Sequence, residues 1–217
     1  MTAKERKIRS EALLREQGIA VNEHLPCTEE ESEVKLKDTE TVCRRAAAAL
    51  VIIQAAFEVR NENSKDFDFF IGMLDKFGVR NELNHKEKSI LDKSCGKQII
   101  TDVIWEYEAY WALAWALGLV EDISDSSDIC DCRAAVGFVS QCEGLDEFIS
   151  KCSLRSKSEI LDMLDLYYRY NWAVVENRLR PGTSVGKLNG DVVVERRRAL
   201  EWLFSKETDW FYISLDT

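Results

Sequence analysis

Proline is scarce in this chain of 217 residues, which has only two, and glycine occurs only ten times. A β-sandwich or barrel needs turn residues about every ten positions, so this scarcity argues against a fold of many short strands. Long apolar runs are also lacking. The longest extends from Ala109 to Val120, whereas a helix that spans a bilayer needs about 20 apolar residues. We therefore expect a helical protein with no membrane partner.

Positive charge is also in short supply. Lys and Arg number 29 against 39 Asp and Glu, which gives a net charge of −10. Binding a nucleic acid requires Lys and Arg to neutralise phosphates, so we expect no nucleic-acid partner. The N-terminal segment "MTAKERKIRSEALL" has no apolar core of signal-peptide length. We expect a soluble, cytoplasmic protein.

Seven cysteines are present, and an odd number without a secretion signal indicates reduced thiols. Four of them fall in "CDCRAAVGFVSQCEGLDEFISKC", which raises the question of a zinc site. Structural zinc usually takes its ligands from close pairs at both ends of the motif. Here only the first pair is close, since nine residues separate each later cysteine from the one before it. We interpret all four as ordinary thiols and expect no cofactor.

Helical periodicity dominates what the sequence does contain. A first helix is predicted over residues 4–17, ended by Gly18, and a long apolar one runs through "CRRAAAALVIIQAAFEV". Thr28, Asn84 and Ser156 each precede a Glu at the spacing of a capping box, which predicts helix starts within about two residues of each. We predict one all-α domain over residues 1–217, with about six to nine helices. A β element, if present, is minor and lies near residues 19–25 or 192–194.

One carboxylate lies where apolar side chains surround it. In "WEYEAYWALAWALGLV", helical geometry places Glu108 one turn from Trp105 and from Ala112, with Trp115 further along the same stripe. A lone ionised carboxylate on such a face costs several kcal/mol. Glu108 is therefore predicted to be buried and to face a cation on another helix.

Two later helices repeat this arrangement. Asp162, Asp165 and Arg169 follow one side of "EILDMLDLYYRYNWAVVENRL", and Glu195 and Arg196 lie in "VVVERRRALEWL". We predict that Arg169 and Arg196 neutralise several of these carboxylates, with at least one of them within reach of Glu108. Four tryptophans are predicted to pack around the charges: Trp105, Trp115, Trp172 and Trp202.

These segments resemble a known family. "RKIRSEALLREQGIAVNEHLP", "WEYEAYWALAWALG", "EILDMLDLYYRYNWA", "VVVERRRALEWL" and the closing "DW…DT" are similar to a widespread bacterial family, the domain-of-unknown-function family 4272. The resemblance covers nearly the whole chain and implies a mostly helical, single-domain bacterial protein without an established activity. The four cysteines at 130–152 are not part of its pattern. The charged positions in the matching segments are Glu108, Asp162, Asp165, Arg169, Glu195, Arg196 and Asp216.

Two functions remain open from the sequence. In the first, the charged cluster is a buried network that fixes helix packing, and the protein is a non-enzymatic interaction or regulatory module with a protein partner. In the second, Glu108, Glu159, Asp162 and Asp165 hold Mg²⁺ in a cleft where Arg169 and Arg196 bind an anionic, phosphate-containing ligand, as in a hydrolase. The sequence leaves open whether the protein is an enzyme.

Overall fold

A computed structural model describes residues 1–62, 66–93 and 95–216. Within these ranges the chain forms nine α-helices and two short 3₁₀ turns, as an all-α fold requires. The helices are α1 (Ala3–Glu16), α2 (Thr39–Arg60), α3 (Phe67–Lys76), α4 (His85–Leu91), α5 (Lys97–Ala116), α6 (Cys132–Ser140), α7 (Leu145–Ser150), α8 (Lys157–Leu179) and α9 (Gly190–Trp202). The 3₁₀ turns are η1 (Arg80–Glu82) and η2 (Trp210–Tyr212).

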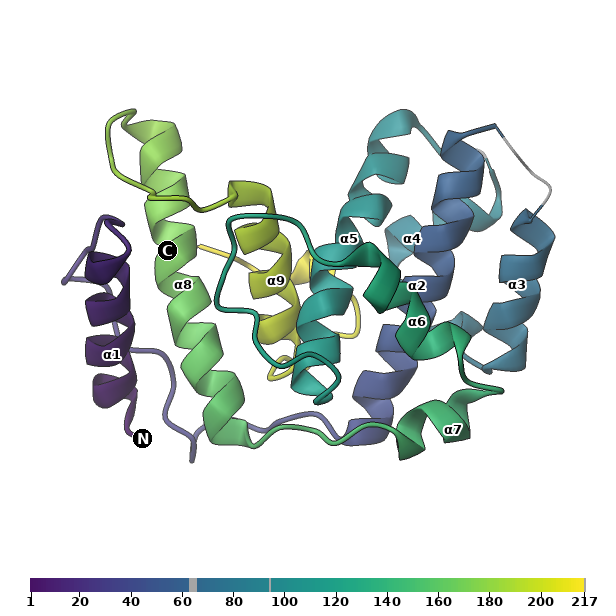
Figure 1. The fold of residues 1–217 in the computed structure, drawn as a ribbon, viewed down its shortest axis with the longest axis horizontal. Coiled ribbons are helices and arrows are strands. Elements are labelled where there is room, and N and C mark those ends of the chain that lie inside the picture. The colour runs from purple at the N-terminus through teal and green to yellow at the C-terminus, as the bar shows by residue number, and fades with distance from the viewer. Residues whose placement is uncertain (63–65, 94, 217) are drawn as a thin grey trace.

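The long helices pack in a row that does not follow the chain order. Helix α2 packs on α5, α5 on α9, α9 on α8, and α8 on α1 (Figure 1). The shorter helices α3, α4, α6 and α7 lie around α2 and α5. Helix α1 thus stands at one end of the molecule, and α8 is the long helix it packs against.

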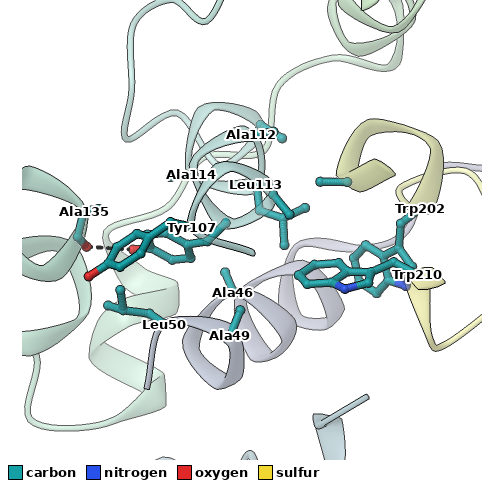
Figure 2. Packing of buried hydrophobic residues seen from close by; sticks show 14 of the residues in the cluster. Ala46, Ala49, Leu50, Tyr107, Ala112, Leu113, Ala114, Ala135, Trp202 and Trp210 are labelled. Carbon is teal, nitrogen blue, oxygen red and sulfur yellow. Dashed lines mark hydrogen bonds between the residues drawn. The ribbon is translucent and has the colours of Figure 1, made fainter. Parts of the chain in front are cut away.

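The core is densest where α2 meets α5. Residues 46–49 of α2 are four consecutive alanines, and all of them are fully buried. Small side chains let two helices approach closely, and α5 offers alanines of its own at positions 109, 112, 114 and 116. Figure 2 shows this contact, with Trp202 and Trp210 packed beside it. The sequence of α2 is apolar on most sides, as a helix in the centre of a core requires.

Most of the predicted helix ends are confirmed. Asn84 and Ser156 each form a full capping box with a Glu three residues later, at the starts of α4 and α8. Gly18 follows α1 with a φ of 68°, a left-handed conformation that glycine adopts without strain. Gly118 follows α5 with a φ of 77°, and a Cβ there would lie 2.8 Å from the carbonyl oxygen of Ser153.

The prediction of a helix at Thr28 is wrong. Residues 27–30 are irregular, and the Thr28 hydroxyl donates a hydrogen bond to Oδ1 of Asp165 at 3.2 Å instead of capping its own chain. The valines at 192–194 lie inside α9, where Asn189 caps the helix, and so they do not form an extended start. Ile19 and Val185 form an isolated antiparallel bridge, and the described residues contain no longer strand.

None of the helices in the described ranges combines the length and the apolar character that a membrane crossing requires.

Candidate functional site

Glu108 is buried and paired with an arginine from a distant helix, as predicted. Its side chain is 2% exposed, and Oε2 accepts a hydrogen bond from Nε of Arg196 at 2.9 Å. Nη2 of Arg196 lies 2.9 Å from the same oxygen. The other oxygen, Oε1, accepts from the backbone N–H of Cys130 at 2.7 Å. The cation is therefore Arg196, and the pair joins α5 to α9 and to the start of α6.

Arg196 continues the network into the connection between α5 and α6. Nη1 donates to the carbonyl oxygens of Asp125 at 2.7 Å and Ile123 at 3.3 Å, and Nη2 donates to that of Asp128 at 3.5 Å. Tyr167 of α8 adds a hydrogen bond from its hydroxyl to the Ile123 carbonyl at 2.6 Å. The arginine of the buried ion pair thus anchors the main chain of a surface loop from the interior of the protein.

This loop is strongly acidic. Residues 121–131 contain no Lys or Arg, and we call this segment the acidic loop. The side chain of Asp125 accepts the N–H of Ser127 in a tight turn, and that hydrogen bond lowers the pKa of Asp125. Asp122 makes the corresponding turn with Ser124. The loop is therefore ordered by its own turns as well as by Arg196. Its exposed acidic residues are Glu121, Asp122, Asp125, Asp128 and Asp131.

Asp165 and Arg169 form a second, separate pair within α8. Asp165 is fully buried, and its two oxygens accept from Nε and Nη2 of Arg169 at 3.0 and 2.9 Å. Nη2 also donates to the carbonyl oxygen of Pro26 at 3.3 Å, and Nη1 lies 3.8 Å from Oε1 of Glu11. Together with the Thr28 hydroxyl, this pair fastens α1 and the connector after it to α8.

The remaining two carboxylates do not join either pair. Asp162 faces α1, where Oδ2 lies 3.5 Å from Nη1 of Arg9. Glu195 pairs with Arg198 on its own helix at 3.2 Å. The prediction that Arg169 and Arg196 neutralise several of the carboxylates is confirmed for Asp165 and Glu108 and does not extend to Asp162 and Glu195. Adjacent helical residues point about 100° apart, so Glu195 and Arg196 face different neighbours although they are consecutive.

The predicted ring of tryptophans around the charges is also wrong. Trp202 is buried against Trp210, with ring centroids 6.3 Å apart, and Trp115 lies under the guanidinium of Arg155. Trp105 and Trp172 are only half-buried. Beside the pair of Arg196 and Glu108 the aromatic group is Tyr167, whose hydroxyl lies 3.3 Å from Nη1 of Arg196. A polar tip suits that place because it can hydrogen-bond the buried cation.

The structure also contains a buried charged cluster that the sequence analysis did not predict. Arg45 of α2 lies 2.5 Å from Glu87 and 3.3 Å from Glu106, and both carboxylates are fully buried. Asn84 donates to Glu106 at 3.1 Å. Burial raises the pKa of Glu106 well above its ordinary value, and the charge of Glu87 raises it further against the opposing charge of Arg45. The guanidinium carbon of Arg45 lies 3.9 Å from the centroid of the Trp210 ring.

A signal for this cluster did exist. Arg45 shares a helical stripe with Val42, Ala46 and Ala49, so the side chain projects from an apolar face. Glu87 was assigned to a capping box, but one of its oxygens remains available after capping. A rule that pairs every arginine on an apolar stripe with a buried acid would have identified the cluster.

Asp162 opens onto a cavity between α1 and α8, which we call the α1–α8 pocket. Its volume is about 580 Å³. The end of α5, the start of the acidic loop and Arg155 complete its wall. Three arginines and five carboxylates line it: Arg6, Arg9, Arg155, Glu16, Glu121, Asp122, Glu159 and Asp162.

The carboxylates named for Mg²⁺ lie in three different places. Glu159 and Asp162 line the α1–α8 pocket, Asp165 is bound to Arg169, and Glu108 is bound to Arg196. In residues 1–62, 66–93 and 95–216, no three Asp, Glu, His or Cys side chains gather in a way that would hold a metal ion. The arrangement therefore supplies structural ion pairs and, at the α1–α8 pocket, a charged cavity.

Comparison with known protein families gives a match over most of the chain. Residues 6–213 match the profile of a family described as "Domain of unknown function (DUF4272)". Neither the curated proteins nor the solved structures contain a match to the chain.

Proposed function

We propose a function from the geometry of the chain, which belongs to the DUF4272 family, because the family description states no activity. In this proposal the protein is a non-enzymatic interaction module that presents the acidic loop to a basic partner protein. The observation that carries this proposal is the set of hydrogen bonds that Arg196 donates to three carbonyl oxygens of the acidic loop. An ordered loop loses less conformational entropy on binding than a flexible one, so this anchoring favours recognition.

Charge supports the choice of partner. The chain carries a net charge of −10, and the acidic loop has five exposed carboxylates without a base. Complementary potentials speed the encounter of two proteins and discriminate against partners of like charge. A partner with a Lys- and Arg-rich surface fits this loop. Ile129, which is 55% exposed, offers that partner an apolar contact near the C-terminal end of the acidic loop.

The test changes the charge of the loop without changing its main chain. A triple variant carries Asp125→Asn, Asp128→Asn and Asp131→Asn, since Asn keeps the side-chain oxygen that accepts the local N–H groups. A control triple makes the same change at three exposed residues elsewhere: Asp68, Asp92 and Asp191. Affinity capture from source cells with quantitative mass spectrometry identifies partners, and calorimetry with the purified partner measures affinity.

We expect a partner that binds the wild type and the control triple, and binds the loop triple at least about tenfold more weakly. Added salt should weaken the wild-type complex, because the contact is electrostatic. Equal affinity of the loop triple and the wild type for every purified partner would exclude this role of the loop.

The metal-dependent alternative makes a different prediction. If a carboxylate cleft held Mg²⁺ or Mn²⁺, either ion would raise the melting temperature, and Asp162→Asn would abolish the rise. An interaction module of the kind we propose shows no such ion-specific stabilisation. The same thermal measurement therefore separates the two functions.

A further inference from the structure

The thiols of Cys43 and Cys152 lie in contact although the two residues are far apart in the sequence. Cys43 belongs to the first turns of α2, and Cys152 follows the end of α7, a helix that packs against α2 (Figure 1). A hydrogen bond joins the two side chains, with Cys43 as the donor and Cys152 as the acceptor. All seven cysteines of the chain are free thiols, so this contact is made between two reduced side chains.

The two thiols differ in their access to solvent. Cys43 is fully buried in the hydrophobic core, whereas Cys152 is partly exposed at the edge of that core. Cys152 belongs to the irregular connector of residues 151–156, and the N–H groups of Ser153 and Arg155 fasten this connector to the end of α5. A small reagent in solution can therefore reach Cys152 first, with Cys43 waiting behind it.

The contact also makes the two thiols differ in acidity. The hydrogen bond from Cys43 lowers the pKa of Cys152, against the opposing effect of burial. The same hydrogen bond, together with burial, raises the pKa of Cys43. The thiolate is the nucleophilic form of cysteine, so the partly exposed member of the pair is also the more easily ionised one. Redox-sensing cysteines share this arrangement, in which an accessible thiol of low pKa lies beside a second thiol that can resolve it.

We propose that Cys43 and Cys152 form a redox-active pair that a hydroperoxide oxidises to a disulfide. The disulfide links α2 covalently to the connector between α7 and α8. The pair lies outside the surface that the acidic loop presents, and this inference does not rest on the proposed function.

The oxidation proceeds in two steps. The Cys152 thiolate attacks one oxygen of hydrogen peroxide, the O–O bond breaks, and a sulfenic acid forms while hydroxide leaves. The hydroxide takes up the proton that Cys152 had released and becomes water. The Cys43 sulfur then attacks the Cys152 sulfur, the S–O bond breaks, and the hydroxyl leaves as a second water with the proton of Cys43. Two thiols and one peroxide thus give one disulfide and two waters, and two electrons pass from sulfur to oxygen.

Mass spectrometry of the intact protein provides the first test. The wild type is reduced, freed of reductant and treated with an equimolar amount of hydrogen peroxide. Its mass should fall by about 2 Da, because a disulfide has lost the two thiol hydrogens, and dithiothreitol should restore the original mass. Digestion without reductant should release one cross-linked pair of peptides that contains Cys43 and Cys152.

Cysteine variants provide the second test. Cys152→Ser should abolish the loss of mass, because it removes the thiol that reacts first. Cys43→Ser should stop the reaction at the sulfenic acid of Cys152, which gains about 16 Da and is captured by dimedone. Cys27→Ser, at an exposed cysteine on a different segment, should form the cross-link as the wild type does. Cys152→Ser changes a partly exposed side chain and serves if the buried variant fails to fold.

Three results would overturn the proposal. The first is a wild-type protein that gains oxygen at Cys152 without losing about 2 Da, because Cys43 would then not resolve the sulfenic acid. The second is a cross-link that joins other cysteines, such as Cys130 and Cys132. The third is a Cys152→Ser variant that loses mass as the wild type does. None of these outcomes involves the carboxylates of the acidic loop, so failure here leaves the test of the proposed function intact.

Discussion

At the scale of single residues, the buried carboxylates differ in the partners that surround them. Glu108 accepts hydrogen bonds from a guanidinium and a backbone N–H. Glu106 shares Arg45 with a second carboxylate, and burial raises its pKa. Glu106 therefore folds most easily as a neutral acid.

Removal of Glu108 should be strongly destabilising. Glu108→Ala leaves Arg196 buried without its carboxylate and the N–H of Cys130 without an acceptor, and breaking a buried pair in this way costs about 3–5 kcal/mol. Chemical denaturation gives the free energy of unfolding. Asp191→Ala, in an exposed ion pair with Arg178, should change it by less than about 1 kcal/mol. A loss of similar size in both variants would contradict the structural role of the Glu108 pair.

Glu106 should make stability depend on pH. Since its pKa is raised in the folded protein, its contribution is fully present below the unfolded pKa and is lost as pH rises through the folded pKa. Glu106→Gln removes this titration, so the unfolding free energy of the variant should rise relative to that of the wild type as pH rises above the ordinary carboxyl pKa of 4.5. Denaturation at several pH values measures the difference. The exposed control Glu62→Gln should show a constant difference, and a constant difference for Glu106→Gln would refute the prediction.

At the scale of elements, the helices differ in what holds them. Helix α2 buries thirteen residues, nearly all apolar, whereas α1 buries five, of which three are polar. Charged and hydrogen-bonded contacts contribute less net stability than apolar burial of the same area, because the polar groups lose their hydration. Helix α1 also lies at the end of the row (Figure 1).

Hydrogen exchange should reveal this difference. Amides of residues 5–16 should exchange through local opening well before amides of residues 43–56, which should open only with global unfolding. Mass spectrometry of peptic fragments measures both segments in one experiment. Asp162→Asn and Arg169→Leu should speed exchange in α1 while that in α2 stays unchanged. Equal protection of α1 and α2 in the wild type would show that the polar contact is as strong as the apolar core.

The long helices could be predicted because their periodicity and caps agree with each other. Asn84 and Ser156 satisfied capping boxes in the sequence, and both begin helices. Thr28 satisfied the same pattern, but its hydroxyl is used by Asp165 from a distant segment. Local spacing cannot reveal a competitor that arrives through tertiary contact, and this explains the one false helix.

The partners of charged residues were predictable only where few choices existed. Glu108 has no basic residue near it on its own helix, so an arginine from another helix could be predicted as its partner. Arg196 is that arginine. Glu195 had Arg198 three residues away, and this local pair formed instead of a distant one. The cluster around Arg45 was not predicted, because its partners Glu87 and Glu106 lie on two other helices and no local spacing connects them to Arg45.

At the scale of the whole molecule, the negative net charge disfavours binding to polyanions such as nucleic acids. A surplus of ten negative charges repels polyanions at every distance below the screening length. We therefore expect no binding to DNA or RNA at micromolar protein and physiological salt. An electrophoretic shift assay measures this. A shifted band that added salt reverses would contradict the prediction, because it would reveal a phosphate-binding surface within an acidic protein.

The manner in which the acidic loop is anchored has an evolutionary consequence. Arg196 and Tyr167 hold it through carbonyl oxygens of the main chain, which every amino acid supplies. Substitutions at positions such as Asp125 and Asp128 therefore leave these anchoring bonds in place. Mutation can explore new surface chemistry in this segment at little risk to folding, so related chains could diverge in specificity here while they keep the same buried arginine.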